Sequence, residues 1–271
     1  MPVACDPFLC VQGLGKTYAE RRWWGGSRSG KTALEDVSFH LEKGRTLGLV
    51  GASGSGKSTL ARALALFEPP TSGAIRIGGR NLWSLGGAER RRARAEVQLI
   101  FQEPAASLNP GFTAAQIVEE PLVIQRWGTR QARREKACGW LQMVGLPRQS
   151  AGKPALHFSG GERQRLAIAR ALILEPKLLL LDEAFSGLDL AIQAQIESLL
   201  AGLGSRLGLT CILISHDLRA VARLADEIAV MDSGRIVEHG ATADLAARAQ
   251  HPRTRELLEA SLALSLDGTL S

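Results

Sequence analysis

Residues 51–58 (GASGSGKS) match the phosphate-binding pattern Gly-x-x-x-x-Gly-Lys-Ser/Thr, and no other stretch restricts the fold as much. The loop lies between an apolar, strand-like run at 46–50 and a run with helical spacing at 60–67, which is the context that the pattern requires. Its three glycines allow successive backbone N–H groups to point at an anion, and the following helix adds its positive end. The sequence therefore predicts a P-loop that binds nucleotide phosphates.

The side chains of this loop have separate predicted roles. Lys57 is expected to contact the β- and γ-phosphates, and Ser58 to supply a hydroxyl to Mg²⁺. A simple turn before a helix would not need Lys and Ser directly after the last glycine. The predicted nucleotide-binding residues of the loop are Gly51, Ser53, Gly54, Gly56, Lys57, Ser58 and Thr59.

A second match to the pattern occurs at residues 25–32 (GGSRSGKT). The residues before it, 20–24 (ERRWW), are charged and aromatic and do not form a buried apolar strand that would hold such a loop rigid. We therefore expect this stretch to be an exposed, basic hairpin tip between two early strands, without a role in nucleotide binding.

Composition narrows the class of protein. The chain has 271 residues, of which 45% are hydrophobic and 22% charged, and this size and composition predict one large domain or one domain with an inserted lobe.

No apolar run reaches the roughly 18 residues of a membrane span, and the start lacks a signal-peptide pattern, so we expect a cytoplasmic protein. Four scattered cysteines predict neither a disulfide framework nor a metal site. The net charge of +6 allows nucleic acid, an anionic membrane surface or nucleotide phosphates as partners.

The order of predicted elements indicates an α/β fold with a mostly parallel sheet. Short strands are expected at 8–12, 14–18, 34–41, 46–50, 74–77, 97–101, 177–182, 210–215 and 227–231. Between about 103 and 154 strand-like runs are absent, and helices are expected at 113–125 and 129–144, which predicts an inserted helical lobe. Ser159 is expected to cap the helix that runs through 166–172.

Three polar side chains follow two of the apolar strands. Asp182 and Glu183 end the run at 177–183, and His216 follows the strand at 210–215. Asp182 is expected to hold Mg²⁺, Glu183 to orient and deprotonate the attacking water, and His216 to hydrogen-bond the γ-phosphate. Together with the P-loop, these groups predict hydrolysis of a phosphoanhydride.

These motifs make the chain resemble the ATP-binding subunit of an ABC transporter. The resemblance covers nearly the whole chain and is carried, in the family order, by Tyr18, 51–58, Gln102, 159–162, 178–183, 186–189 and His216. It implies a single domain over 1–271, built on a P-loop NTPase (RecA-like) core with a mostly parallel sheet and an antiparallel β subdomain. The implied ATP-binding core covers 1–102 and 166–240. An inserted helical subdomain would cover 103–165, and a C-terminal helical extension 241–271.

The resemblance also implies site roles. Tyr18, which from the residues alone is most simply a half-buried aromatic, would stack on adenine, and Gln102 would join Mg²⁺ and water to the helical subdomain. Asp189 would serve communication across a dimer. The signature residues Ser159, Gly160, Gly161 and Glu162 would close over ATP held by another subunit.

Implied cofactors and partners follow from the same resemblance. They are ATP, Mg²⁺, two transmembrane permease subunits, a second ATPase subunit in a homo- or heterodimer, and indirectly a substrate-binding protein. The implied location is peripheral, on the cytoplasmic face of the cell membrane, with no nucleic acid bound.

Two shorter stretches, 101–110 and 251–254 (HPRT), are similar to those of the oligopeptide, dipeptide and nickel importer class. Glu162, Ala184 and Arg253 depart from the usual Gln, Pro and Tyr of that class. The chain also lacks the longer, cysteine-bearing tail of many oligopeptide members. That difference, together with residues 182–184 (DEA), makes the chain similar to the shorter nickel-type subunit. Two alternatives remain: an ATPase of a cytosolic phosphonate-degrading assembly, and a soluble ABC ATPase that acts on nucleic acid.

Overall fold

The computed structural model describes residues 7–19, 30–101, 107–185 and 187–267. The chain divides into two compact units, one formed by Met1–Arg90 with Thr210–Ser271 and the other by Arg91–Leu209. Each unit has its own strands and helices, and each is described separately below.

The first unit contains an antiparallel sheet with the strand order β2-β1-β4-β5. Its strands are β1 (Leu9–Ala19), β2 (Gly30–Leu41), β4 (Ser72–Ile77) and β5 (Arg80–Asn81). The two strands predicted at 8–12 and 14–18 are one strand, because β1 continues through irregular pairing with β2 near Gly13, whose φ is 56°. Alternate residues of β1 and β2, such as Val11 and Phe39, are buried.

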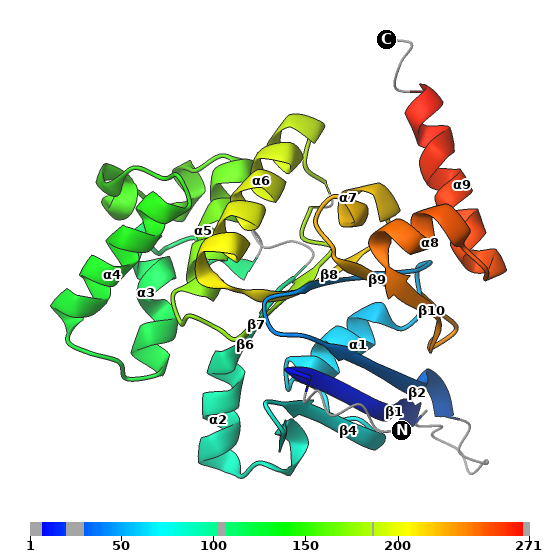
Figure 1. The fold of residues 1–271 in the computed structure, drawn as a ribbon. Coiled ribbons are helices and arrows are strands. Elements are labelled where there is room, and N and C mark those ends of the chain that lie inside the picture. Colours follow the sequence, from blue (N-terminus) through cyan, green and yellow to red (C-terminus); the bar gives the residue numbers. More distant parts are fainter. Residues whose placement is uncertain (1–6, 20–29, 102–106, 186, 268–271) are drawn as a thin grey trace, which may run out of the picture. The chain divides into compact units, whose positions relative to one another are not determined.

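A mostly parallel group of strands forms the rest of the sheet structure in this unit (Figure 1). Strand β3 (Thr46–Val50) pairs in parallel with β8 (Thr210–Ser215) on one side and with β9 (Glu227–Asp232) on the other. Strand β10 (Arg235–Ala241), which was not predicted, pairs antiparallel with β9. The predicted strands at 46–50, 210–215 and 227–231 are confirmed. All three are apolar runs because both of their faces are covered.

Helical segments pack on the strands of this unit. They are α1 (Lys57–Leu64), η1 (Leu82–Ser84), α7 (Leu218–Ala222), α8 (Thr242–Arg248) and α9 (Pro252–Asp267). A Cβ at Gly48 would lie 2.0 Å from the Val221 side chain, so the glycine allows α7 to lie close against β3. Figure 1 shows α8 and α9 beside β9 and β10, where Leu257 and Leu258 pack against a core that includes Ile228.

The second unit contains β6 (Val97–Ile100) in parallel with β7 (Leu178–Asp182). Its helices are α3 (Ala114–Ile124), α4 (Arg130–Met143), α5 (Gly160–Leu172) and α6 (Leu190–Leu207), with short 3-10 segments η3 (Arg148–Gly152) and η4 (Ala155–His157). Helix α2 (Gly87–Glu96) crosses the boundary between the units. Figure 1 shows α3, α4 and α5 as one packed group.

The helices of this group begin at capping residues that the sequence contains. Thr113 accepts a hydrogen bond from the N–H of Gln116, and the Gln116 side chain accepts one from the Thr113 N–H. Thr129 accepts from the Ala132 N–H at the start of α4. Such contacts satisfy N–H groups that would otherwise have no partner in the first turn. The two helices predicted at 113–125 and 129–144 are confirmed to within two residues.

The predicted fold class is therefore confirmed: an α/β chain with a mostly parallel sheet, an antiparallel β sheet and a helical subdomain. The second compact unit covers a longer stretch of the chain than the helical subdomain predicted at 103–165. It also contains β6, β7 and α6. Within the ranges that the structure describes, none of the helices combines the length and the apolar character that a membrane span requires.

Candidate nucleotide site

The P-loop follows β3 directly and ends in α1, as the motif predicts. A Cβ at Gly51 would lie 2.2 Å from the carbonyl oxygen of Met231, so the first glycine is required by the close approach of β9. Gly56 has a φ of 107°, which is unfavourable for residues with a Cβ, and its Cβ would lie 2.6 Å from the Ala33 carbonyl oxygen. The backbone shape of the loop therefore depends on glycine at both ends.

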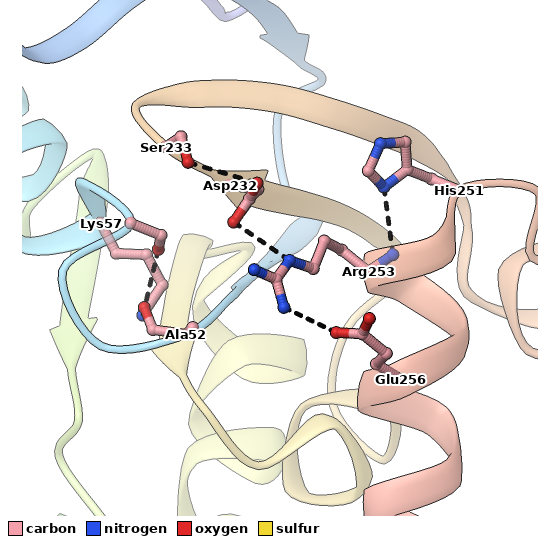
Figure 2. Close-up of polar contacts among 8 residues, drawn as sticks. Ala52, Lys57, Asp232, Ser233, His251, Arg253 and Glu256 are labelled. Carbon is pink, nitrogen blue, oxygen red and sulfur yellow. Dashed lines mark hydrogen bonds and ion pairs between the residues drawn. The ribbon is translucent and has the colours of Figure 1, made fainter.

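Lys57 lies folded into this loop (Figure 2). Its Nζ donates hydrogen bonds to the carbonyl oxygens of Gly51, at 2.7 Å, and Ala52, at 2.9 Å. The side chain is only 5% exposed, although lysine is rarely buried unless it is paired. Ser58 and Thr59 lie half-buried in the first turn of α1, and Ser53 and Gly54 lie exposed in the loop. The arrangement places a buried cation inside a loop of backbone amides, which suits an anion.

Tyr18 lies near the end of β1, where its ring orientation is fixed by two neighbours. Its hydroxyl donates to Glu68 Oε2 at 2.5 Å, and the Lys16 ammonium lies 5.0 Å from the ring centroid. Lys16 also donates to the Pro69 carbonyl oxygen at 2.7 Å. The phenol is thus held as a rigid, partly exposed platform, a property that base stacking would use.

His216 and the P-loop share one edge of the sheet. Val50 and Ser215 are paired residues of the parallel strands β3 and β8, so Gly51 and His216 follow at the same carboxyl end. This edge is where open α/β sheets bind ligands. Asp217, the next residue, accepts hydrogen bonds from the N–H groups of Arg219 and Ala220 and so caps α7. Its role is therefore structural.

In the second unit, β7 ends at the predicted acidic pair. Asp182 is 8% exposed, and Glu183, half-buried, has a φ of 48°. A non-glycine residue in this region is strained, and such strain is found preferentially at functional sites. The Gln164 side chain, itself buried, donates from Nε2 to the Ala184 carbonyl oxygen at 2.7 Å and so links α5 to the turn after β7. Gln164 belongs to none of the motifs in the sequence, although its amide lies in the otherwise mostly apolar buried face of α5.

The signature residues form the start of α5. Ser159 Oγ accepts from the Glu162 N–H at 3.3 Å, and Glu162 Oε2 accepts from the Ser159 N–H at 2.7 Å, which is a capping box. The Ser159 backbone hydrogen bond holds the pKa of Glu162 below its ordinary value, so this carboxylate is ionised near neutral pH. A Cβ at Gly161 would lie 2.9 Å from the Ile192 side chain. The Ile192 N–H donates to Asp189 Oδ1 at 2.9 Å, so Asp189 caps α6.

The predicted site residues thus lie on two units. Tyr18, residues 51–59 and His216 belong to the first unit, whereas Asp182, Glu183, residues 159–162 and Asp189 belong to the second. Gln102 lies outside the described residues. Of the second P-loop-like stretch, residues 30–32 are described, and they lie in β2 opposite Thr17, Tyr18 and Ala19.

The donor set that the sequence assigns to Mg²⁺ fits that ion chemically. It consists of the Ser58 hydroxyl, the Asp182 carboxylate and the Gln102 amide, and hard divalent cations prefer such oxygen ligands. In the described part of the chain no group of three His, Cys, Asp or Glu residues is arranged to hold a metal ion. Mg²⁺ commonly keeps water and substrate oxygens among its six ligands, and a set of three protein oxygens would leave positions for them.

Comparison with known proteins identifies the family. The model of the ABC transporter family matches residues 34–186. The chain is 45% identical over 264 residues to the di/tripeptide transport ATP-binding protein DppF of Pseudomonas aeruginosa, covering 97% of this chain and 82% of that protein. It is 41% identical over 262 residues to the dipeptide transport ATP-binding protein DppF of Escherichia coli, covering 97% of this chain and 78% of that protein.

Solved structures lead to the same result. The structure of cbiO1 from Clostridium perfringens, part of the ABC transporter complex cbiONQ, matches with a TM-score of 0.78 and 27% identity over 90% of this chain and 92% of that one. A dimeric, post-hydrolysis structure of the ATP-binding cassette MJ0796 with ADP and Pi matches with a TM-score of 0.74 and 27% identity over 86% of this chain and 98% of that one. The chain therefore belongs to the ABC transporter family, as one of its ATP-hydrolysing, ATP-binding proteins.

Proposed function

We propose that this chain is the ATP-binding subunit of an importer for dipeptides or other short peptides. The observation that carries the proposal is identity of 41% to 45% with dipeptide and di/tripeptide transport ATP-binding proteins over nearly the whole chain. These relatives favour peptides over nickel as the transported substrate. The nickel-type interpretation stays a prediction, which here rests on residues 182–184 (DEA).

In the proposed reaction, the P-loop amides and Lys57 hold the phosphates of ATP, and Tyr18 stacks on the adenine. Ser58, Asp182 and Gln102 would hold Mg²⁺, which when bound offsets the negative charge on the phosphates. Glu183 accepts the proton of the attacking water and aligns that water with the γ-phosphate. His216 donates a hydrogen bond to the γ-phosphate as its charge redistributes.

The complete site is proposed to need a second ATPase subunit. Residues 159–162 of one subunit would approach the ATP held by the P-loop of the other, since the N-terminus of a helix binds anions. Two such heterologous contacts close into a ring of two, and the dimer of the related cassette bound to ADP and Pi supports this arrangement. The dimer would bind two permease subunits at the cytoplasmic face of the membrane.

Copurification from detergent-solubilised membranes tests the proposal. A tagged chain should retain two polytopic membrane proteins and either a second ATPase or a second copy of itself. The purified complex in proteoliposomes should hydrolyse ATP faster when a peptide-loaded binding protein is added. Recovery of the chain only with soluble enzymes of phosphonate breakdown, or only with nucleic acid, would replace the importer with one of the two alternatives.

A further inference from the structure

The C-terminal helix α9 reaches the sheet edge that contains the P-loop. We propose that Arg253 of this helix is a positioning residue for ATP binding, which acts by neutralising Asp232 and by fixing the turn after it. The inference rests on the proposed binding of ATP by the P-loop. The proposal goes beyond that function, because it makes the affinity of the P-loop for ATP depend on the contact of α9 with the turn after β9.

The turn after β9 supports the P-loop directly. The Gly234 N–H donates to the Ser55 carbonyl oxygen of the loop at 2.9 Å, and the Gly234 carbonyl accepts from the Glu35 N–H at 2.9 Å. Near the end of β9, the carbonyl oxygen of Met231 lies against Gly51 of the loop. Residues 231–234 therefore contact the P-loop at two points and β2 at a third. A shift of this turn would move the loop backbone with it.

Asp232 places a negative charge at this edge. Val230 is paired with Val50 in the parallel strands β9 and β3, so Asp232 and the P-loop both extend beyond the same carboxyl end. Its side chain is 27% exposed, so water screens its charge only in part. A carboxylate near a site for phosphates repels the ligand unless a cation compensates it. The fold must therefore provide a compensating charge.

Arg253 provides that charge. Its Nε lies 3.5 Å from Asp232 Oδ1, and its Nη1 donates to Glu256 Oε2 at 2.7 Å. Figure 2 shows the Arg253 side chain extending from α9 to Asp232 on the side where Ala52 and Lys57 of the P-loop lie. Glu256, on the same helix, holds the guanidinium in this extended position. The Ser233 hydroxyl contacts the other oxygen of Asp232 at 3.3 Å.

Arg253 is not what attaches α9 to the molecule. Glu238 of β10 accepts hydrogen bonds from the Gln250 N–H at 2.8 Å and the His251 N–H at 3.0 Å, just before α9 begins. Farther along the helix, Leu257 and Leu258 pack on the core beneath it. An exposed ion pair adds little to folding stability. Loss of Arg253 is therefore expected to change ATP affinity more than the melting temperature.

The test measures ATP affinity of the full-length chain by isothermal titration, with Glu183→Gln in all variants to prevent turnover. Arg253→Ala should weaken ATP binding about threefold to tenfold, an effect of one uncompensated charge near several phosphate charges, and high salt should reduce the difference. Arg253→Lys, which keeps the charge, should bind nearly normally. Arg255→Ala is the matched control, because it removes an exposed cation of the same helix turn whose Nε donates to the Ala249 carbonyl oxygen and not to Asp232.

Combining Arg253→Ala with Asp232→Asn decides the mechanism. Removal of both charges should restore most of the lost ATP affinity. If the two substitutions instead damaged the structure independently, their losses of affinity would add. Lys57→Ala separates the two proposals: normal ATP binding by that variant would refute the P-loop assignment itself. If Lys57→Ala abolishes binding while Arg253→Ala binds normally, or if Asp232→Asn fails to restore affinity, the role of Arg253 is refuted alone.

Discussion

At the scale of single residues, Lys57 is proposed to hold phosphates and Glu183 to accept a proton, so their loss should have different effects. Lys57→Ala removes the buried cation of the P-loop and should abolish or strongly weaken ATP binding. Glu183→Gln keeps the phosphate site and removes only the proton acceptor, so binding should persist while hydrolysis falls by about 10² or more. ATP titration and steady-state phosphate release measure the two effects. Normal turnover by Glu183→Gln in the assembled transporter would exclude Glu183 as the base.

Glu162 carries a second residue-scale prediction. Its carboxylate accepts the Ser159 N–H at the start of α5, so the helix end that is predicted to meet the partner's ATP already holds a negative charge. Glu162→Gln keeps an acceptor for the capping box and removes the charge. ATP-dependent dimerisation, measured by analytical ultracentrifugation with Glu183→Gln present, should therefore strengthen by about twofold to fivefold.

The matched control is Glu162→Ala, which removes the charge and the acceptor for the Ser159 N–H together, while Ser159 still caps the helix. It should lower the melting temperature, because one of the two hydrogen bonds of the capping box is lost. Unchanged dimerisation in Glu162→Gln would show that this carboxylate does not oppose the partner's nucleotide.

At the scale of elements, the second P-loop-like stretch is predicted to be idle. Gly30, Lys31 and Thr32 lie in β2 and pair with β1, so they do not form the start of a helix as a phosphate loop requires. Lys31→Ala should leave ATP affinity and ATPase activity within twofold of the parent chain. Lys57→Ala, measured alongside it, serves as the positive control. A collapse of ATP binding in Lys31→Ala would mean that sequence context does not decide which match binds phosphate.

The elements that the sequence predicted best are the buried parallel strands. Strands β3, β7 and β8 were predicted to within one residue, because short, mostly apolar runs occur where both faces of a sheet are covered. Strand β10 was missed, because Arg235–Ala241 mixes charged and apolar residues without a clear alternation. Strand β1 was divided in two, because Gly13 and Gly15 interrupt its pattern.

The candidate site was predictable only where the chemistry is local in sequence. The P-loop and the capping of α5 by Ser159 depend on neighbouring residues, and both are present at the expected positions. The contact of Gln164 with Ala184 and that of Arg253 with Asp232 join residues 20 or more positions apart, so no local pattern indicates them. The positive φ of Glu183 is likewise not indicated by a local sequence pattern.

At the scale of the whole molecule, we propose that activity depends on a second subunit. The P-loop follows β3, whereas residues 159–162 begin a helix of the other compact unit. Closing a second subunit's signature over the bound ATP would add N–H donors to the γ-phosphate only in the closed state. A ligand shifts a conformational equilibrium only by its differential affinity for the two states. The closing of this dimer is thus the step that can drive the membrane subunits.

The isolated chain should therefore be a slow ATPase whose specific activity rises with protein concentration and rises further in the assembled transporter. Ser159→Arg places a bulky cation at the start of α5 and should inhibit hydrolysis at the partner's P-loop more than at its own. Two mixed dimers, each with one intact P-loop, measure this directly. With Ser159→Arg on one subunit and Lys57→Ala on the other, the intact P-loop faces an unchanged signature and should stay active. With both substitutions on the same subunit, the intact P-loop of the parent subunit faces Ser159→Arg and should be inhibited. Fast hydrolysis by a dilute, demonstrably monomeric chain would contradict this dependence, because a single copy would then supply every group that the reaction needs.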